Sequence, residues 1–272
     1  MRMHFVSISG ISSPYELDEL KHELGNVRFE NHEIVIGYQF SHKSICQGPS
    51  NNRQPHLKDV TDLFETTRKY GFEPTIHYYT KDSQTIMPDL HILLKENHLD
   101  YFAKKIQFNT LPLESSLLEE VTTLFDVDII FKVSVALSDV GAFKKEDYNI
   151  KELTNFVLER PMIRYAMFDP THGASVDPKT GKKRTLNITR AGAFGKQMRK
   201  YHLPLIFAGG INSENASRVI EKLAAAVGSA QFSVDAESGL RKPNPHTTAY
   251  GMDTFNPKKA REYVLACKDV FG

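Results

Sequence analysis

The chain has 272 residues, with 34 Lys and Arg against 33 Asp and Glu, which leaves a formal net charge of +1. This balance argues against a nucleic acid or a membrane surface as the principal partner. Hydrophobic residues make up 40% of the chain, enough for a large core, and charged residues make up 25%, enough for a solvated surface. Because the sequence shows no signal segment and no long apolar span, we expect a cytoplasmic protein.

Eight apolar runs of buried-strand length follow one another along the chain. In order they are Met3–Ser9, Glu33–Phe40, Glu73–Tyr79, Asp100–Phe108, Asp128–Val135, Ile163–Asp169, Pro204–Ala208 and Ala230–Val234. Segments with helical periodicity lie between them, among them Pro14–Leu24, Leu57–Tyr70, Ser115–Leu124, Ile150–Leu158, Ile188–Tyr201, Glu214–Ala226 and Pro257–Val270. Strands alternating with helices indicate a parallel sheet.

The length favours one closed barrel over two smaller domains, because such a barrel takes about 250 residues. No linker rich in Pro, Gly and Ser divides the chain. We therefore predict an α/β fold, a single (β/α)8 or TIM barrel with eight parallel strands over residues 1–272.

The cysteines and histidines do not form a recognisable metal motif. Cys46 and Cys267 lie far apart, so we expect two reduced thiols. The 11 histidines are scattered, and no His-x-x-x-His pair falls within a predicted helix beside a third ligand. We expect no metal site.

Two predicted strands end in glycine-containing turns, LIFAGGIN (Leu205–Asn212) and FSVDAESG (Phe232–Gly239). Glycine lets the backbone turn sharply and lets its amides approach an anion closely. The carboxyl ends of the strands meet at one end of a barrel, called here the barrel mouth, and a helix start there adds free amides. We predict a phosphate site formed by Gly209, Gly210, Asn212, Ser238 and Gly239. The alternative is two ordinary strand-to-helix turns.

Short motifs at the strand ends extend this pattern. They are Ile8-Ser9-Gly10-Ile11-Ser12 after the first strand, Gln107 in the fourth, Phe168-Asp169 after the sixth, and then AGGIN and VDAESG. Their order resembles that of the phosphoribosylanthranilate isomerase family, which are (β/α)8 barrels of tryptophan biosynthesis. The resemblance runs through nearly the whole chain as motif order, and it is specific near the C-terminus.

The resemblance implies an Amadori rearrangement that needs no cofactor and no metal. A general acid protonates the ribose ring oxygen, and a general base removes a proton from the neighbouring carbon. The acid position corresponds to Asp169, and the base position, a cysteine in the family, corresponds to Ser9. A serine hydroxyl supplies almost no anion near neutral pH unless another base takes its proton, and His4 or His172 are candidates for that base.

Other positions depart from the family pattern. Ser-Pro-Arg is replaced by Ser44-Ile45-Cys46, so Lys43 or Arg53 would have to bind the substrate carboxylate. Gln-Leu-His-Gly becomes Gln107-Phe108-Asn109-Thr110, which leaves Gln107 and Asn109 as substrate-binding candidates.

Charged residues near the predicted mouth raise further expectations. In the segment Pro170–Asn187, Lys182 and its two cationic neighbours could close over an anionic substrate, or could be a solvated loop. Lys132, counted here among the substrate-binding residues, would pair with Asp169 or Asp128 if it points inward. Glu237 stands where the family has serine in the phosphate turn. An anion there requires that Glu237 turns outward or is neutralised by Arg241 and Lys242.

These observations predict a divergent relative of the family that binds a small phosphorylated metabolite and isomerises it by acid–base chemistry. Two alternatives remain open. One is a non-catalytic barrel that binds a ligand or a partner protein. The other is a different phosphate-dependent barrel, an epimerase or an aldolase, and the aldolase would use Lys132 as its reactive amine.

Overall fold

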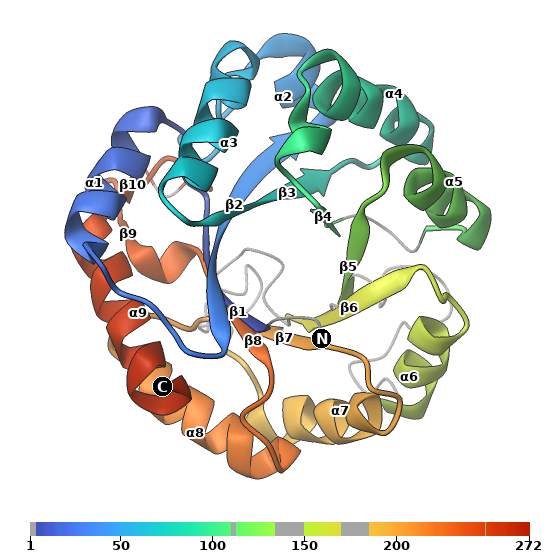
Figure 1. Cartoon of the computed structure of the whole chain (residues 1–272), viewed down its shortest axis with the longest axis vertical. Helices are drawn as coiled ribbons and strands as arrows, with labels where there is room; N and C mark the ends of the chain where they lie inside the picture. The colour runs from blue at the N-terminus through green and yellow to red at the C-terminus, as the bar shows by residue number, and fades with distance from the viewer. Residues whose placement is uncertain (1–3, 110–112, 134–149, 170–184, 248) are drawn as a thin grey trace.

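Eight parallel strands form a closed barrel in the computed structural model, which describes residues 4–109, 113–133, 150–169, 185–247 and 249–272. Each strand pairs with the next along the chain, and β8 pairs with β1 to close the sheet. In Figure 1 the helices form a ring around this barrel. The predicted TIM barrel is confirmed.

The strands lie close to their predicted positions. They are β1 (His4–Ser9), β2 (His32–Ser41), β3 (Glu73–Tyr79), β4 (Lys105–Phe108), β5 (Asp128–Val133), β6 (Ile163–Phe168), β7 (Leu205–Ala208) and β8 (Ser233–Ala236). Two predictions were displaced. β4 begins at Lys105 rather than Asp100, because Leu99–Tyr101 forms a 3₁₀ turn, and β8 lies later than Ala230–Val234.

The helices are α1 (Pro14–Leu24), α2 (His42–Gln47), α3 (Val60–Lys69), α4 (Ile86–His91), α5 (Ser115–Phe125), α6 (Ile150–Leu158), α7 (Ile188–Lys200), α8 (Ala216–Val227) and α9 (Pro257–Phe271). Single helical turns lie at Leu57–Asp59, Ser83–Thr85, Ile92–Glu96, Leu99–Tyr101 and Ser238–Leu240. α2 and α4 were not predicted, because six residues are too few for a helical period to stand out. A short antiparallel pair, β9 (Arg241–Lys242) with β10 (Thr254–Phe255), was also missed.

The sheet separates two apolar clusters. Outward strand residues, such as Ile36, Tyr78 and Phe207, pack against the helices in the main core. Alternate residues face the barrel interior. The apolar ones form a second cluster of Phe5, Val35, Ile130, Tyr165, Met167, Ile206 and Ala208. Polar side chains such as Ser9, His77 and Asp235 join them toward the carboxyl ends of the strands, so the interior becomes more polar at the mouth.

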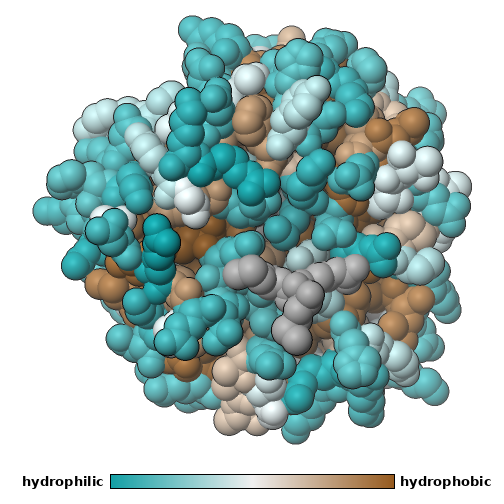
Figure 2. All heavy atoms as spheres, in the orientation of Figure 1, coloured by the Kyte–Doolittle hydropathy of each residue, from teal (hydrophilic) through white to brown (hydrophobic). Residues whose placement is uncertain are grey.

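On the face shown in Figure 2, hydrophilic side chains form most of the surface, and hydrophobic side chains show between them in separate patches. In the described part of the chain, no helix has both the length and the apolar character needed to cross a membrane. The carbonyl of Gly272, after α9, accepts a hydrogen bond of 3.2 Å from the amide of Glu30 ahead of β2.

Gly37 in β2 makes room inside the barrel for two polar neighbours. A Cβ at this position would lie 2.5 Å from Oγ of Ser9 and 2.6 Å from Cε1 of His77. Both neighbours are buried, at 0% and 4% exposure, so neither can move aside into solvent. The missing side chain at Gly37 therefore helps to set the spacing of the polar layer at the mouth.

We predict that Gly37→Ala lowers the free energy of unfolding by about 1–3 kcal/mol, the cost of overpacking a dense interior. Urea unfolding measures this change. Thr75→Val is the matched control, because Thr75 pairs with Gly37 across the sheet and its buried hydroxyl has no hydrogen-bond partner among the described residues. That control should leave stability unchanged or raise it. Equal stability of Gly37→Ala and the parent would contradict the crowding argument.

Candidate active site at the barrel mouth

A lysine–aspartate ion pair lies at the centre of the mouth. Nζ of Lys132 on β5 is 2.6 Å from Oδ2 of Asp169, which directly follows β6, and both side chains are largely buried. Burial lowers the pKa of Lys132, but the carboxylates of Asp169, Glu237 and Asp235 outweigh burial and raise it. The lysine is therefore cationic. Its predicted pairing with Asp169 is confirmed, and Asp128 lies 3.9 Å from Arg164 instead.

A second carboxyl group, Asp235, faces the base position of the family. Oγ of Ser9 at the end of β1 donates to Oδ1 of Asp235 on β8 at 2.5 Å, and Oγ of Ser7 lies 3.3 Å from Oγ of Ser9. Burial raises the pKa of Asp235, and the Glu237 and Asp169 charges add to this, while hydrogen bonds from Ser9 and Ser7 lower it. The result is a pKa of about 6. Asp235 can therefore gain and lose a proton near neutral pH.

Sequence reasoning missed Asp235, although a signal was present. Asp235 lies two residues before Glu237 in VDAESG, and Ser233 lies two residues before Asp235. Ser233 and Asp235 alternate with apolar residues in β8, and Glu237 continues the alternation just after the strand, a pattern typical of one face turned toward a polar interior.

Neutral polar groups complete the mouth. Burial lowers the pKa of His77 on β3 to about 4, aided by the Lys132 charge and opposed by Glu237, so the imidazole is neutral at pH 7. Nε2 of Gln107 donates to Oδ1 of Asn109 at 2.9 Å. Oε1 of Gln107 is buried and has no hydrogen-bond partner among the described residues. A buried acceptor of this kind is stabilised when a ligand hydroxyl donates to it.

The two predicted phosphate turns lie against each other. A Cβ at Gly239 would lie 2.6 Å from the carbonyl oxygen of Ile211 and equally close to Cβ of Asn212, so the turn after β8 touches the turn after β7. Gly209 and Gly210 have φ values of 110° and 73°, which favour glycine. The predicted adjacency of these turns is confirmed. Binding of an anion between them stays a prediction.

The start of α8 offers fewer free amides than expected. The helix begins at Ala216 rather than at Glu214, and the amide of Ala216 donates to the carbonyl of Asn212. Oδ1 of Asn212 accepts from the amides of Glu214 and Asn215 at 2.9 and 3.1 Å. Asn212 thus binds its own turn through this oxygen, and the amides of residues 214–216 already have partners.

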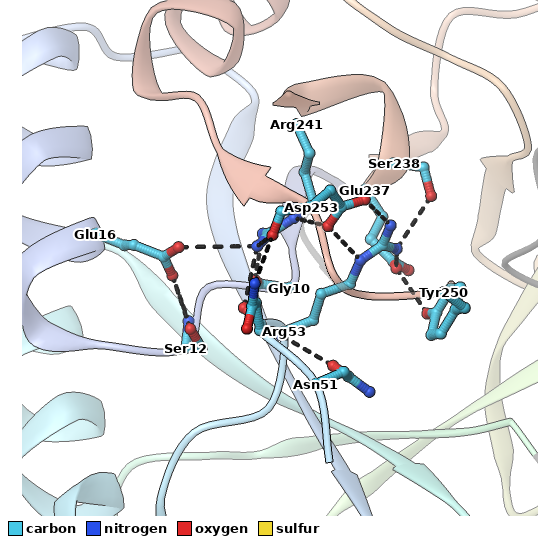
Figure 3. A network of polar contacts seen from close by, with 11 residues as sticks. Gly10, Ser12, Glu16, Asn51, Arg53, Glu237, Ser238, Arg241, Tyr250 and Asp253 are labelled. Carbon is cyan, nitrogen blue, oxygen red and sulfur yellow. Dashed lines mark hydrogen bonds and ion pairs between the residues drawn. The ribbon is translucent and has the colours of Figure 1, made fainter. Parts of the chain in front are cut away.

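Glu237 is held by a cation that was predicted for another role (Figure 3). Arg53, from the loop after α2, binds the Glu237 carboxylate and also donates to Oγ of Ser238 at 3.0 Å. The Tyr250 hydroxyl donates to Oε1 of Glu237 at 2.9 Å. Burial raises the pKa of Glu237, but Arg53 and the hydrogen bonds from Tyr250 and Gln39 outweigh it and lower the pKa. Glu237 is ionised and charge-paired.

The sequence suggested Arg53 as a partner for a substrate carboxylate, but in the structure Arg53 is not available for that role. Its guanidinium also binds Asp253, and its side chain is 3% exposed. Arg241 does not neutralise Glu237 either. It binds Oδ1 of Asp253 at 2.6 Å and donates to the carbonyl of Gly10 at 2.7 Å. The two arginines and Asp253 thereby join the loops after β1, β2 and β8 into one buried polar network (Figure 3).

The remaining predicted site residues fall into two groups. Lys182, its cationic neighbours and His172 lie outside the described residues. His4 is described, and its ring packs 5.7 Å from that of His32 at the amino end of β1. Because Ser9 is at the other end of the same strand, about 16 Å away at the rise of an extended chain, His4 is not the base that acts on Ser9.

Comparison with known proteins identifies the architecture. No family model matches the chain, and no curated protein matches its sequence. A GH113 β-1,4-mannanase aligns with a TM-score of 0.55 at 8% identity over 100% of this chain and 99% of that chain. The fold is that of a TIM barrel.

Two further structures agree at this level. The carboxyl transferase domain of Rhizobium etli pyruvate carboxylase aligns with a TM-score of 0.56 at 9% identity, over 99% of this chain but 48% of that chain. A designed cube-shaped protein cage aligns with a TM-score of 0.52 at 10% identity, over 99% of this chain and 74% of that chain. At such identities the likeness concerns the fold alone, and none of these three proteins is a phosphoribosylanthranilate isomerase.

We predict that Arg53→Met lowers the free energy of unfolding by about 3–5 kcal/mol, because it leaves the partly buried Glu237 carboxylate without its cation and leaves Asp253 with Arg241 alone. Urea unfolding at neutral pH provides the measurement. Arg68→Met is the matched control, since Arg68 is 40% exposed and pairs with Glu73 near the surface. The control should cost at most about 1 kcal/mol. Similar losses in the two variants would refute the structural role of Arg53.

Proposed function

We propose that this barrel is an enzyme that isomerises a small sugar phosphate by acid–base chemistry, in the manner of the phosphoribosylanthranilate isomerase family. One observation supports it above the others. A carboxyl group with a pKa of about 6, Asp235, lies 2.5 Å from Ser9, the residue at the family's base position. Asp235 replaces the missing cysteine as the proton acceptor.

The Ser9–Asp235 pair can accept a proton, whereas the Lys132–Asp169 pair can donate one. Asp235 is largely ionised above pH 6, so it accepts the proton from the sugar carbon, directly or through Ser9 passing its own proton on. The Lys132–Asp169 pair holds a proton on the lysine amine, and that pair protonates the ribose ring oxygen. In the tautomerisation that completes the isomerisation, Asp235 delivers its proton to the anomeric carbon, and the proton lost by the neighbouring hydroxyl returns to the Lys132–Asp169 pair, so that both groups regain their starting states. Separation of the acid and the base allows both steps at one pH.

Substrate binding follows from the neutral groups and the glycine turns. Oε1 of Gln107, the acceptor without a partner among the described residues, would receive a sugar hydroxyl, with Asn109 beside it. The turns containing Gly210 and Gly239 would bind the phosphate. Pairing of Glu237 with Arg53 supports this assignment, because it cancels the charge that would repel a phosphate.

The protonation of Lys132 argues against the aldolase alternative. A lysine that forms a Schiff base must be a neutral amine, and it reaches that state when burial or a neighbouring cation lowers its pKa. The carboxylates around Lys132 raise its pKa instead. Its role is therefore that of a cation and proton donor.

We predict that Asp235→Asn lowers kcat for phosphoribosylanthranilate by about 10²–10⁴-fold, the usual contribution of a general base. In the parent, kcat/KM should rise with pH through an apparent pKa of about 6. The control is Asp128→Asn, which changes a half-exposed carboxyl at the amino end of β5. Turnover that survives in Asp235→Asn would rule out the proposed base. Stabilisation by ribose phosphates in a thermal-shift assay without turnover would favour a non-catalytic binding barrel.

The stability of the same variant separates chemistry from misfolding. A pKa raised from 3.8 to about 6 in the folded state means that the fold loses stability as pH rises through this window. At one pKa unit per 1.36 kcal/mol, the ionised Asp235 costs about 3 kcal/mol above pH 7. Asp235→Asn should therefore unfold at higher urea concentration than the parent at pH 8, with little difference near pH 4.

We predict that Glu237→Ser strengthens the binding of inorganic phosphate, because it restores a hydroxyl in the turn and releases Arg53 from one of its two carboxylates. Isothermal titration calorimetry measures the affinity. Glu262→Ser on the exposed face of α9 removes the same charge at a distance and should leave phosphate affinity unchanged. Unchanged affinity in Glu237→Ser would remove this turn from the proposed phosphate site.

A further inference from the structure

Three metal-ligating side chains meet in the outer ring of helices. His42 and Cys46 are on α2, and Asp89 is on α4. Nδ1 of His42 lies 3.0 Å from Oδ2 of Asp89 and 3.8 Å from Sγ of Cys46. One donor atom from each residue lies within 4.8 Å of the other two. α2 and α4 are neighbours in the ring in Figure 1.

The spacing suits a tetrahedral ion. Bonds of about 2.0–2.3 Å at tetrahedral angles place neighbouring donor atoms roughly 3.3–3.8 Å apart. The two separations from Nδ1 of His42, 3.0 Å to Asp89 and 3.8 Å to Cys46, lie slightly below this range and at its upper limit. His42 and Cys46 are four residues apart on one helix, so their side chains leave the same face. An imidazole, a thiolate and a carboxylate together form a donor set that Zn²⁺ accepts.

The carboxylate of this cluster is positioned from behind by the core. Asp89 is 1% exposed, and the buried hydroxyl of Tyr78 on β3 donates to its Oδ2 at 2.6 Å. Outer hydrogen bonds of this kind orient the carboxylates that bind metals. His42 and Cys46, by contrast, are exposed. The cluster therefore has a fixed inner side and an outer side that water reaches.

We propose that His42, Cys46 and Asp89 bind one Zn²⁺ ion, with a fourth coordination position open to water. Three protein ligands with an open position are the arrangement of a zinc site that can exchange ligands, whereas purely structural zinc sites use four. The sequence expectation of no metal site is revised by this proposal. That expectation looked for two histidines four residues apart, whereas here the second residue is a cysteine and the third ligand comes from another helix.

Titration of the chelator-treated protein with Co²⁺ tests the site. Co²⁺ occupies zinc sites and reports a bound thiolate by a charge-transfer absorption in the near ultraviolet. The expected result is one Co²⁺ per chain with this absorption, displaced by Zn²⁺. A titration without the thiolate absorption would overturn the proposal.

Four variants locate the ion. Cys46→Ser should abolish the thiolate absorption, and His42→Ala should weaken Co²⁺ binding at least about tenfold; both positions are exposed, so neither change should prevent folding. Tyr78→Phe keeps the ring and should weaken binding about 10–100-fold through loss of its hydrogen bond to Asp89. His22→Ala, an exposed histidine on α1, is the control and should bind like the parent. Persistence of the absorption in Cys46→Ser, or equal affinities of His42→Ala and His22→Ala, would also refute the site.

Discussion

A buried ammonium group controls the electrostatics of this barrel. The inward series of strand residues brings Asp169, Asp235 and Glu237 to one end of the interior, where water is scarce and like charges repel strongly. Lys132 pairs with the first of these carboxylates and attracts the other two. Arg53 pairs with the third. Among the described residues, the direct partners of Asp235 are serine hydroxyls rather than a cation, and this difference gives it a pKa near neutrality while its neighbours stay charged.

Burying these charged groups lowers the stability of the fold, a cost that a wholly apolar interior would not have. The apolar cluster inside the same barrel, built from residues such as Phe5, Ile130 and Met167, shows what the fold uses where no chemistry is needed. The mouth instead buries ionised groups, a neutral histidine and an amide oxygen without a partner among the described residues. Departures from simple packing rules tend to gather at functional sites. That contrast within one barrel supports a catalytic mouth more directly than its resemblance to any particular family.

Much of the fold could be predicted from the sequence, because the relevant signals are local. An apolar run such as Ile163–Asp169, or a glycine turn such as Gly209-Gly210, is formed by residues that are close together in the sequence. Eight repeats of strand and helix then leave few other architectures. The prediction failed where a segment was too short to show a period, as in α2 and α4. It also failed at β4, where the apolar residues ahead of Lys105 belong to a 3₁₀ turn and its packing.

The site was less predictable because its partners come from distant parts of the chain. For an inward Lys132 the sequence offered Asp169 or Asp128 as partners, and the structure selects Asp169, which follows the neighbouring strand β6. Arg53 was assigned to a substrate, because nothing near it in sequence shows the carboxylates that it meets, which lie 184 and 200 residues away. The cluster of His42, Cys46 and Asp89 was missed for the same reason. Only the His-x-x-x-Cys spacing of His42 and Cys46 is visible in the sequence, and the fold is needed to bring Asp89 beside them.

The contacts of Arg53 also bear on how the protein assembles during synthesis. Its loop is made well before Glu237 and Asp253, which follow it in the chain by 184 and 200 residues. Until then the guanidinium has no buried partner, and β1 has no β8 to pair with. Strands and helices can form as they are made, but the mouth of the barrel can take its final shape only after β8 and the segment that carries Asp253 have been made.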